Sequence, residues 1–329
     1  MLTVVRLNCP PADYFPEEPE GAAFCRAFQD SAVPNFRSGF LAVHRGATRI
    51  TVLPYFVTAF RVSTMLGEGL LGRSLAWLKL SIACVGHPST DFGLIQGEVS
   101  EEVLDAVNRE LSKESSLVSY KGFPGDLPLP GFVKAKGLPV PILPVTKHFY
   151  SRLPSHRRND LRRKLKKARE LRIEEYAGLP CNLTHEVFNL YLQTYERASI
   201  KFERLPVDYF EKTSALSKYL VIYEDARPVA FAQMVCRNGK MVHKYIGIDY
   251  AKNRQYRLYF LLFLKAIDIC MREGYGQLEL GVSDYYFKRF LGSTITDTYN
   301  YYRHGNRAMQ WLLRKLRWLL EPSKEETLA

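Results

Sequence analysis

The sequence predicts a mixed α/β fold, an α+β arrangement of mixed sheets in two domains of the same kind. Its 329 residues are enough for two domains of ordinary size. Hydrophobic residues make up 47% of the chain and charged residues 24%, which is typical of a folded protein. Both halves present strand-like runs, a helix-like run and a further strand-like run. We therefore expect an internal duplication of about 150 residues, with mostly antiparallel domains at residues 1–145 and 146–329.

The order of elements is clearest in the second half. We expect strands over residues 218–223, 228–237 and 241–248, a helix over 255–273 and a short strand over 277–281. The Asn238-Gly239 pair suits a tight hairpin between the second and third strands. Gly274 marks the end of the helix. This half therefore reads as a three-stranded meander, a helix and one more strand.

The first half repeats that order more loosely. We expect strands over residues 39–45, 49–60 and 92–98, a helix over 100–113 and a strand over 116–123. Gly46 lies in the first turn, and Ser100 followed by two glutamates predicts a capped helix start. The proline-rich residues 123–145 form a natural connector between the domains. Alternatively, they form an extended strand that pairs across the domains.

Positive charge favours an anionic partner. The 46 Lys and Arg against 34 Asp and Glu give a formal charge of +12, which suits nucleic acid, phosphate-bearing cofactors or acidic lipid. Residues 155–172 alone contribute +7, and their leucines and alanine fall on one helical stripe. This helix is either a solvated basic face or an anion-binding helix beside a cleft, with Arg157 and Arg158 as candidate contacts.

The sequence also indicates a compartment. The N-terminus lacks a basic region followed by a long apolar run, so no signal peptide is expected. The most apolar window, residues 65–86, contains Glu68, Arg73 and Lys79, too many charges for an unassisted membrane span. Six scattered cysteines without a CxxC pair predict reduced thiols and no metal site. We expect a cytoplasmic protein that has the option of membrane association.

One lysine stands among aromatic residues near the end of the chain, in the stretch ELGVSDYYFKRFLGS (residues 279–293). Together with the basic segment, the meander and the helix before it, this stretch resembles the GNAT-related acyltransferases of the Fem type. Those include the peptidyltransferases that add amino acids to peptidoglycan precursors, and a broader set of bacterial N-acyltransferase-like proteins. The resemblance covers nearly the whole chain as tandem GNAT-like domains.

The resemblance implies roles for several residues. The Phe-Lys pair of the Fem motif matches Phe287 and Lys288, and the family's lysine lies in an inter-domain channel near the donor carbonyl. There it can stabilise the charge that develops during acyl transfer. Tyr286 is a candidate substrate contact beside it. The alternative is that Lys288 only extends from an amphipathic turn into solvent.

Three further candidates come from the strands and loops. The turn of residues 86–93 is similar to the family's turn before the fourth strand, and the resemblance places Asp91 at its acidic position, where it would recognise an acceptor amine or take its proton. Capping of the loop is the alternative role for Asp91. Strand alternation sends His243 and Tyr245 to one face, where they either contact substrate or form a structural pair.

The donor is left open by the sequence. An acetyl-CoA-binding GNAT has a glycine-rich loop where residues 249–260 here contain no glycine, which argues against acetyl-CoA. Lys252, Arg254 and Arg257 supply positive charge at that place, beside helix amides that can receive a phosphate. We expect no tightly bound cofactor. The candidate donors are aminoacyl-tRNA, acyl-CoA and a carrier-bound acyl group, attacked directly by an amine acceptor in the inter-domain cleft.

The C-terminal segment is amphipathic. Its apolar stripe consists of Met309, Leu312, Leu313, Leu316 and Leu320. Trp311 and Trp318 lie at the edge of that stripe. We expect core packing against the second domain, with docking on an anionic membrane as the alternative. Two non-catalytic functions also compete: nucleic-acid binding through residues 157–172, and a membrane-surface scaffold. The oligomeric state is left open.

Overall fold

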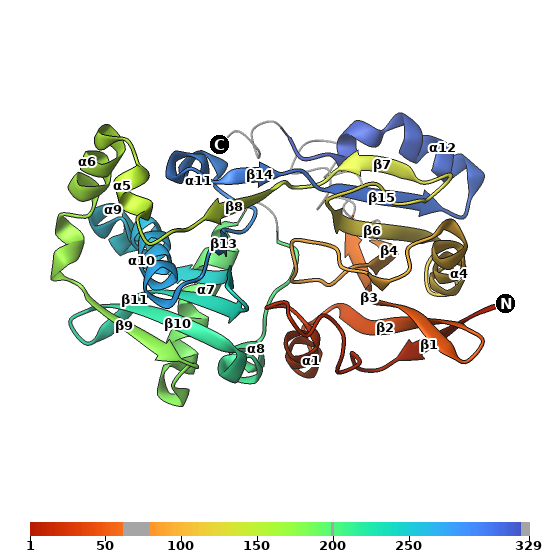
Figure 1. Cartoon of the computed structure of the whole chain (residues 1–329), viewed down its shortest axis with the longest axis horizontal. Helices are drawn as coiled ribbons and strands as arrows, with labels where there is room; N and C mark the ends of the chain where they lie inside the picture. Colours follow the sequence, from red (N-terminus) through yellow and green to blue (C-terminus); the bar gives the residue numbers. More distant parts are fainter. Residues whose placement is uncertain (62–78, 199–200, 324–329) are drawn as a thin grey trace. The chain divides into compact units, whose positions relative to one another are not determined.

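The computed structural model describes residues 1–61, 79–198 and 201–323, and these residues form two compact units (Figure 1). Unit 1 consists of Met1–Pro16, Val33–Val140 and Thr296–Ala329, and unit 2 of Glu17–Ala32 and Pro141–Ile295. The main break, between Val140 and Pro141, lies close to the expected boundary after residue 145. However, each unit also takes a segment from the other half of the chain, which the sequence did not indicate.

Unit 1 contains a mixed sheet. Its strands are β1 (Leu2–Leu7), β2 (Phe36–Arg45), β3 (Thr48–Arg61), β4 (Lys79–Val85), β5 (Gln96–Gly97), β6 (Leu117–Phe123), β7 (Val133–Lys136) and β15 (Tyr299–His304). The order is β1-β2-β3-β4-β6-β15-β7, with β5 paired to β3. Among the described strands of this sheet, only β4 and β6 are parallel, and helix α4 (Glu101–Leu111) connects them. As expected, the Ser100 side chain caps this helix by accepting a hydrogen bond from the amide of Val103.

Unit 2 repeats the arrangement. Its strands are β8 (Val140–Pro144), β9 (Arg172–Ala177), β10 (Ser217–Glu224), β11 (Arg227–Arg237), β12 (Lys240–Ile248), β13 (Gln277–Glu279) and β14 (Thr294–Thr296). The order is β14-β8-β13-β12-β11-β10-β9. Strands β9 to β12 form an antiparallel meander, and β13 runs parallel to β12. The predicted duplication is therefore confirmed at the level of strand order.

Eight α-helices belong to the described part of unit 2. They are α1 (Ala22–Asp30), α5 (Phe149–Arg152), α6 (Ser155–Lys164), α7 (Thr184–Arg197), α8 (Val207–Lys212), α9 (Tyr250–Tyr256), α10 (Leu258–Glu273) and α11 (Tyr285–Leu291). Short 3-10 turns cover Lys167–Glu170, Cys181–Leu183 and Ser214–Leu216. Unit 1 adds α12 (Arg307–Lys315) and the 3-10 turn η4 (Arg317–Leu320).

The proline-rich connector forms strands, as its alternative interpretation held. It supplies β7 to the sheet of unit 1 and β8 to the sheet of unit 2, and both strands pair with strands of the second expected domain, β7 with β15 and β8 with β13. Strand β15, from the far end of the chain, enters the sheet of unit 1 between β6 and β7. The strand beside β6 in unit 1 is thus β15, from late in the chain, and the strand beside β13 in unit 2 is β8, from before the other strands of that sheet.

Two expected helices are shorter than predicted. The helix over residues 255–273 is interrupted at Arg257, whose φ of 56° ends α9 before α10 begins. The basic helix ends at Lys164, and the chain then passes through a 3-10 turn into β9. The apolar stripe of the basic segment is still buried, because Leu161, Ala168 and Leu171 pack into the core of unit 2.

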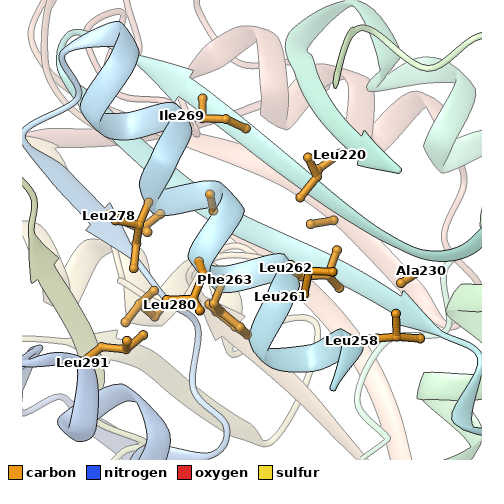
Figure 2. Close-up of a cluster of buried hydrophobic side chains, with 14 of the residues drawn as sticks. Leu220, Ala230, Leu258, Leu261, Leu262, Phe263, Ile269, Leu278, Leu280 and Leu291 are labelled. Atoms are coloured by element: carbon orange, nitrogen blue, oxygen red, sulfur yellow. The ribbon is translucent and has the colours of Figure 1, made fainter. Parts of the chain in front are cut away.

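Helix α10 supplies much of that core. Figure 2 shows Leu258, Leu261, Leu262 and Phe263 of this helix in one cluster of buried side chains with Leu220 and Leu280.

Helix α7 approaches the sheet of unit 2 closely at Gly247. A Cβ atom at this glycine would lie only 2.5 Å from the backbone carbon of Leu190 in α7. Only glycine therefore allows this packing between α7 and β12.

The C-terminal helix differs from its expected core packing. No residue of α12 is buried, and Met309, Trp311 and Leu312 are exposed. The helix packs on β15 at one end of unit 1, so only part of its apolar stripe is covered. Most of the apolar window of residues 65–86 lies outside the described residues. Within the described ranges, no helix is long and apolar enough to cross a membrane.

Candidate functional site

The parallel strands of unit 2 part after a short pairing. β12 and β13 are paired at Lys240 with Gln277, Met241 with Leu278, and Val242 with Glu279. β12 then continues to Ile248, whereas the other chain turns away at Gly281, whose φ of 72° is in the left-handed region. We call the region between His243 and Gly281 the divergence. A residue other than glycine would be strained in this turn.

Lys288 is buried at the divergence. It lies on α11, which starts where the Asp284 side chain accepts a hydrogen bond from the amide of Phe287. The Lys288 side chain is 0% exposed, and its Nζ donates a hydrogen bond to the carbonyl of Gly281 at 2.9 Å. The same nitrogen lies 5.6 Å from the ring centroid of Phe263. Lys288 therefore does not extend into solvent, and the alternative for this residue is wrong.

His243 lies beside this ammonium. Its ring stacks on Phe263 with centroids 4.3 Å apart and planes 13° from parallel. Burial, together with the neighbouring Lys288 ammonium, lowers the pKa of His243 to about 3. The imidazole is therefore neutral near pH 7. Its Nε2 is buried and has no hydrogen-bond partner among residues 1–61, 79–198 and 201–323.

Aromatic rings enclose the divergence. Phe287 is 2% exposed and lies 4.3 Å from the ring of Phe260 and 5.9 Å from those of Tyr259 and Phe263. Burial raises the pKa of the Tyr259 hydroxyl. These rings keep water away from Lys288, so electrostatic interactions there are stronger than in water.

Sequence reasoning missed Tyr259 and Glu279 at this place. Glu279 is 8% exposed between the buried Leu278 and Leu280, and an acidic residue in an otherwise apolar strand was the available signal. Tyr259 lies four residues before Phe263, so both point to one side of α10, but that spacing alone indicates only core packing.

The predicted alternation of β12 is wrong because the strand contains a bulge. Ala232 of β11 pairs with Ile246, and Met234 pairs with His243. Two β12 residues, Lys244 and Tyr245, therefore stand opposite the single residue Gln233. A bulge of this kind reverses the facing of the residues that follow it. His243 consequently packs on α10, whereas Tyr245 lies on the opposite face of the sheet.

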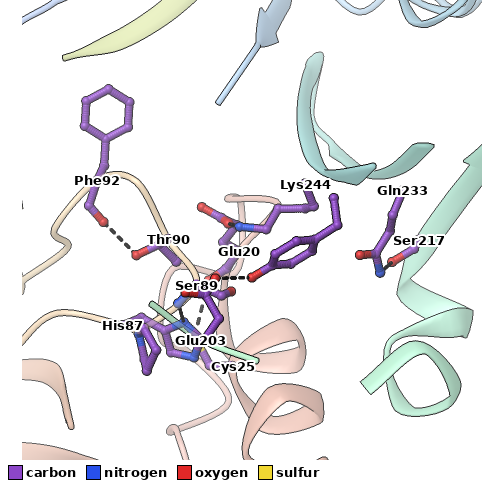
Figure 3. Close-up of polar contacts among 12 residues, drawn as sticks. Glu20, Cys25, His87, Ser89, Thr90, Phe92, Glu203, Ser217, Gln233 and Lys244 are labelled. Carbon is purple, nitrogen blue, oxygen red and sulfur yellow. Dashed lines mark hydrogen bonds and ion pairs between the residues drawn. The ribbon is translucent and has the colours of Figure 1, made fainter. Parts of the chain in front are cut away.

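The bulge places two polar contacts on that opposite face, both drawn in Figure 3. The Tyr245 hydroxyl donates to a carboxylate oxygen of Glu203 at 2.6 Å. Lys244 forms an ion pair with Glu20, and their side chains are only 5% and 9% exposed. Lys244 also lies 5.3 Å from the ring centroid of Phe24. No local pattern in the sequence indicates this pair, because its members are 224 residues apart.

The basic candidates around α9 separate into two groups. Lys252 forms an ion pair with Glu224 at 2.7 Å, so its charge is already balanced within the protein. Arg254 and Arg257 are exposed, and neither has a carboxylate partner in the part of the chain that the structure describes. Helix α9 occupies the place of a glycine-rich loop.

The first turn of α10 already has a side-chain partner. The Asn253 side chain accepts a hydrogen bond from the amide of Tyr259 at 3.2 Å. This amide is therefore occupied and is a poor candidate for holding a phosphate.

The basic helix α6 lies against the helix that carries Lys288. Arg157 donates to the carbonyl of Phe290 at 2.7 Å, and its guanidinium carbon lies 5.3 Å from the Phe290 ring centroid. Lys164 lies 5.5 Å from the same ring centroid. Arg158 instead bonds the carbonyl of Ser151. Tyr286, on α11, is 71% exposed. The structure thus brings Arg157 to α11 and leaves Arg158 near its own helix start.

Asp91 lies in unit 1, where Lys121 rather than Asp91 holds the loop. The Lys121 Nζ donates to the carbonyls of His87, Pro88 and Thr90 at 3.4, 2.9 and 2.8 Å. The Asp91 carboxylate is half-buried and makes no hydrogen bond or ion pair with any described residue. The capping role that was the alternative for Asp91 is therefore wrong.

The cysteines do not provide a nucleophile at this site. All six are free thiols, and Cys9 and Cys181 are exposed rather than buried. Burial raises the pKa of Cys84 and of Cys236 to about 11. A thiol with such a pKa is protonated near pH 7 and reacts slowly.

Comparison with known proteins supports the same fold. Residues 155–289 match the family model of an acetyltransferase (GNAT) domain. The chain is similar to L-PGS from Bacillus licheniformis, with a TM-score of 0.53, 12% identity, and coverage of 83% of this chain and 87% of that one.

A tandem GNAT protein from the clavulanic acid biosynthesis pathway gives a TM-score of 0.52 and 12% identity, with coverage of 93% and 99%. The structure of FemX gives a TM-score of 0.51 and 12% identity, with coverage of 90% and 93%. No curated protein matches the sequence. The chain therefore has the fold of two tandem GNAT-like domains, each a mostly antiparallel sheet flanked by helices.

Proposed function

We propose that the chain is an N-acyltransferase, which moves an acyl or aminoacyl group from an activated donor to an amine. One observation supports this most strongly. A fully buried lysine, Lys288, lies where the parallel strands of unit 2 part, within the segment that matches the GNAT model. An ammonium in such an apolar enclosure is costly to bury, and stabilising a developing negative charge is a function that explains its place.

The chemistry follows from that charge. The acceptor amine attacks the carbonyl carbon of the donor ester or thioester, and the carbonyl oxygen becomes an oxyanion. The Lys288 ammonium stabilises this oxyanion, a contribution on the order of 3 kcal/mol by analogy with a lost oxyanion-hole donor. The carbon–oxygen or carbon–sulfur bond then breaks. The leaving alcohol or thiol takes up the proton that the amine loses, so atoms and charge balance.

His243 has a separate role in this proposal. With a pKa of about 3, it holds a proton too weakly to serve as the general base near pH 7. Its neutral ring can instead hydrogen-bond a bound group through Nε2 and keep that group beside Lys288. Phe287 then acts by excluding water rather than by touching reacting atoms.

The donor remains one of three anionic classes: aminoacyl-tRNA, acyl-CoA or a carrier-bound acyl group. Arg254 and Arg257 support binding of such a donor, because they are exposed and lack carboxylate partners in the described ranges. Arg158 on α6 adds to the same positive field. The absence of glycine between residues 249 and 260 argues against the usual pyrophosphate grip of acetyl-CoA. Asp91 stays a candidate for recognising the acceptor amine.

The test is to incubate the protein with a panel of these donors and of amines, and to detect products by mass spectrometry. Replacing Lys288 by Ala should lower turnover about a hundredfold or more while donor binding persists. Lys288→Met keeps the length of the side chain without the charge and should lose the same activity. Lys288→Arg should rescue poorly, because a guanidinium is planar and bulkier.

Lys265→Ala is the matched control, because this lysine forms a partly exposed pair with Asp268 on α10. It should keep the parental rate. Turnover by Lys288→Ala at that rate would overturn the assignment. A protein that forms no product, yet binds RNA through the arginines of α6 whether or not Lys288 is present, would instead be a non-catalytic nucleic-acid-binding protein.

A further inference from the structure

Unit 1 contains a hollow of about 890 Å³ between helices α4 and α12. One face of α12 lines it, with Arg307, Trp311 and Arg314 spaced as neighbours on a helix. Arg109 faces it from α4, and Arg303 from β15. The volume lies within the range of sites that hold small ligands. All of these residues belong to unit 1, so the hollow is built by one folded unit.

The charge of the hollow is not balanced by the residues that the structure describes. Four guanidiniums line it, against the single carboxylate of Asp105. None of the four arginines forms an ion pair with a residue in the described ranges. Elsewhere in unit 1, by contrast, Arg6, Arg37, Arg45 and Arg49 all pair with carboxylates. Four guanidiniums against one carboxylate leave an excess of positive charge that favours an anion, and the planar guanidinium fork matches phosphate geometry.

The C-terminal segment whose α12 lines the hollow also carries exposed apolar side chains, and Trp311 is the one of these that lines the hollow itself. Trp311 is 60% exposed and Trp318 is 67% exposed, and Met309 and Leu312 are 37% and 38% exposed. Large apolar side chains and arginines on one short helical segment are the combination that binds the interface of an anionic bilayer. Tryptophan in particular favours the headgroup level of a membrane. A site for a soluble phosphate or for RNA would not require the exposed methionine and leucine.

We propose that this hollow binds the phosphate headgroup of an anionic phospholipid, while Trp311 and Trp318 enter the bilayer interface. The arginines would contact the phosphate oxygens, and α12 would lie along the membrane surface. This inference does not depend on acyl transfer, because it concerns unit 1 alone.

The test measures flotation of the full chain with phosphatidylcholine vesicles that contain or lack phosphatidylglycerol. The informative variant is Arg109→Gln with Arg314→Gln, which removes two charges that line the hollow. Its control is Lys315→Gln with Arg317→Gln. This variant removes two charges of the same C-terminal segment, and neither residue lines the hollow. All four side chains are exposed, so neither variant should disturb folding.

We expect binding to vesicles with phosphatidylglycerol, and binding by the hollow variant about tenfold weaker than by the control variant. Trp311→Ala should weaken vesicle binding but leave binding of soluble glycerol 3-phosphate unchanged. Equal losses in the two double variants would show non-specific attraction and overturn the site. A protein that binds a short RNA more tightly than vesicles, or that binds glycerol 3-phosphate but does not bind vesicles, would overturn the assignment to a lipid. None of these measurements requires turnover, so a failure of the proposed enzyme activity would be distinguishable from a failure of lipid binding.

Discussion

The two units share a sheet topology but use a lysine differently beside their parallel strands. In unit 1, Lys121 at the end of β6 donates to three carbonyls of the loop after β4 and thereby fixes that loop. In unit 2, Lys288 follows β13 on a separate helix and is enclosed by aromatic rings beside the neutral His243. The difference shows that one fold can place an ammonium where it holds a loop or where it is enclosed beside parting strands. Among the described residues, the enclosed lysine is the one to which we assign the proposed chemistry.

The largest expected effect tests the buried ion pair at the bulge of β12 in unit 2. Replacing Lys244 by Met should destabilise the protein by about 3–5 kcal/mol, because it removes the ammonium that compensates the charge of the buried Glu20 carboxylate. Urea unfolding of the variant measures this loss. The same change at Arg45, which forms an exposed pair with Glu98 in unit 1, should cost far less. Equal losses at the two positions would show that the buried pair is not special to unit 2.

The next effect concerns Lys121. Lys121→Met removes the donor for three carbonyls and should lower the free energy of unfolding by about 1–3 kcal/mol. Turnover measured below the unfolding transition should stay near the parental rate, unlike that of Lys288→Ala. Thermal unfolding and initial rates, recorded on the same samples, separate the two quantities. A large loss of turnover with unchanged stability would mean that Lys121 takes part in the reaction and that the comparison fails.

The third effect is the pH dependence that His243 imposes on unit 2. Its pKa falls from the ordinary 6.5 to about 3 in the folded protein. Below pH 6.5 the unfolded chain therefore takes up a proton that the folded protein does not. As pH is lowered from 6.5 to 3, this residue alone should decrease the free energy of unfolding by about 1.4 kcal/mol for each pH unit.

Replacing His243 by Phe should flatten that dependence, as measured by urea unfolding at pH 7, 6 and 5. The exposed His185 gives the control variant, His185→Phe, which should keep the parental slope. An unchanged slope in His243→Phe would contradict the burial of a neutral imidazole at the divergence.

Local signals in the sequence predicted much of the fold. The meander of unit 2 has strands within a few residues of those expected, because its apolar runs and its turn act over short distances. Asn238 and Gly239 both have positive φ, as a tight hairpin turn requires. Gly274 ends α10 with a φ of 81°. In each case the deciding residue lies beside the structure that it determines.

The candidate site could be predicted only in part. The position of Lys288 after a short strand and among rings was visible in the sequence, but its complete burial was not. Burial depends on Phe263 and on the carbonyl of Gly281, which α10 and the turn after β13 bring to it. The facing of His243 and Tyr245 was predicted wrongly, because a bulge depends on the register between two strands and leaves no local pattern.

The sequence by itself therefore determined the mixed α/β class, the repeated order of elements, the position of Lys288 in its motif and the excess of positive charge. Tertiary structure alone decided the exchange of β8 and β15 along the chain, the Glu20–Lys244 pair and the four arginines that meet in one hollow. The physical reason is distance along the chain. Periodicity, capping and turn preferences act between neighbours, whereas these features join residues up to about two hundred positions apart, whose meeting depends on the packing of whole elements.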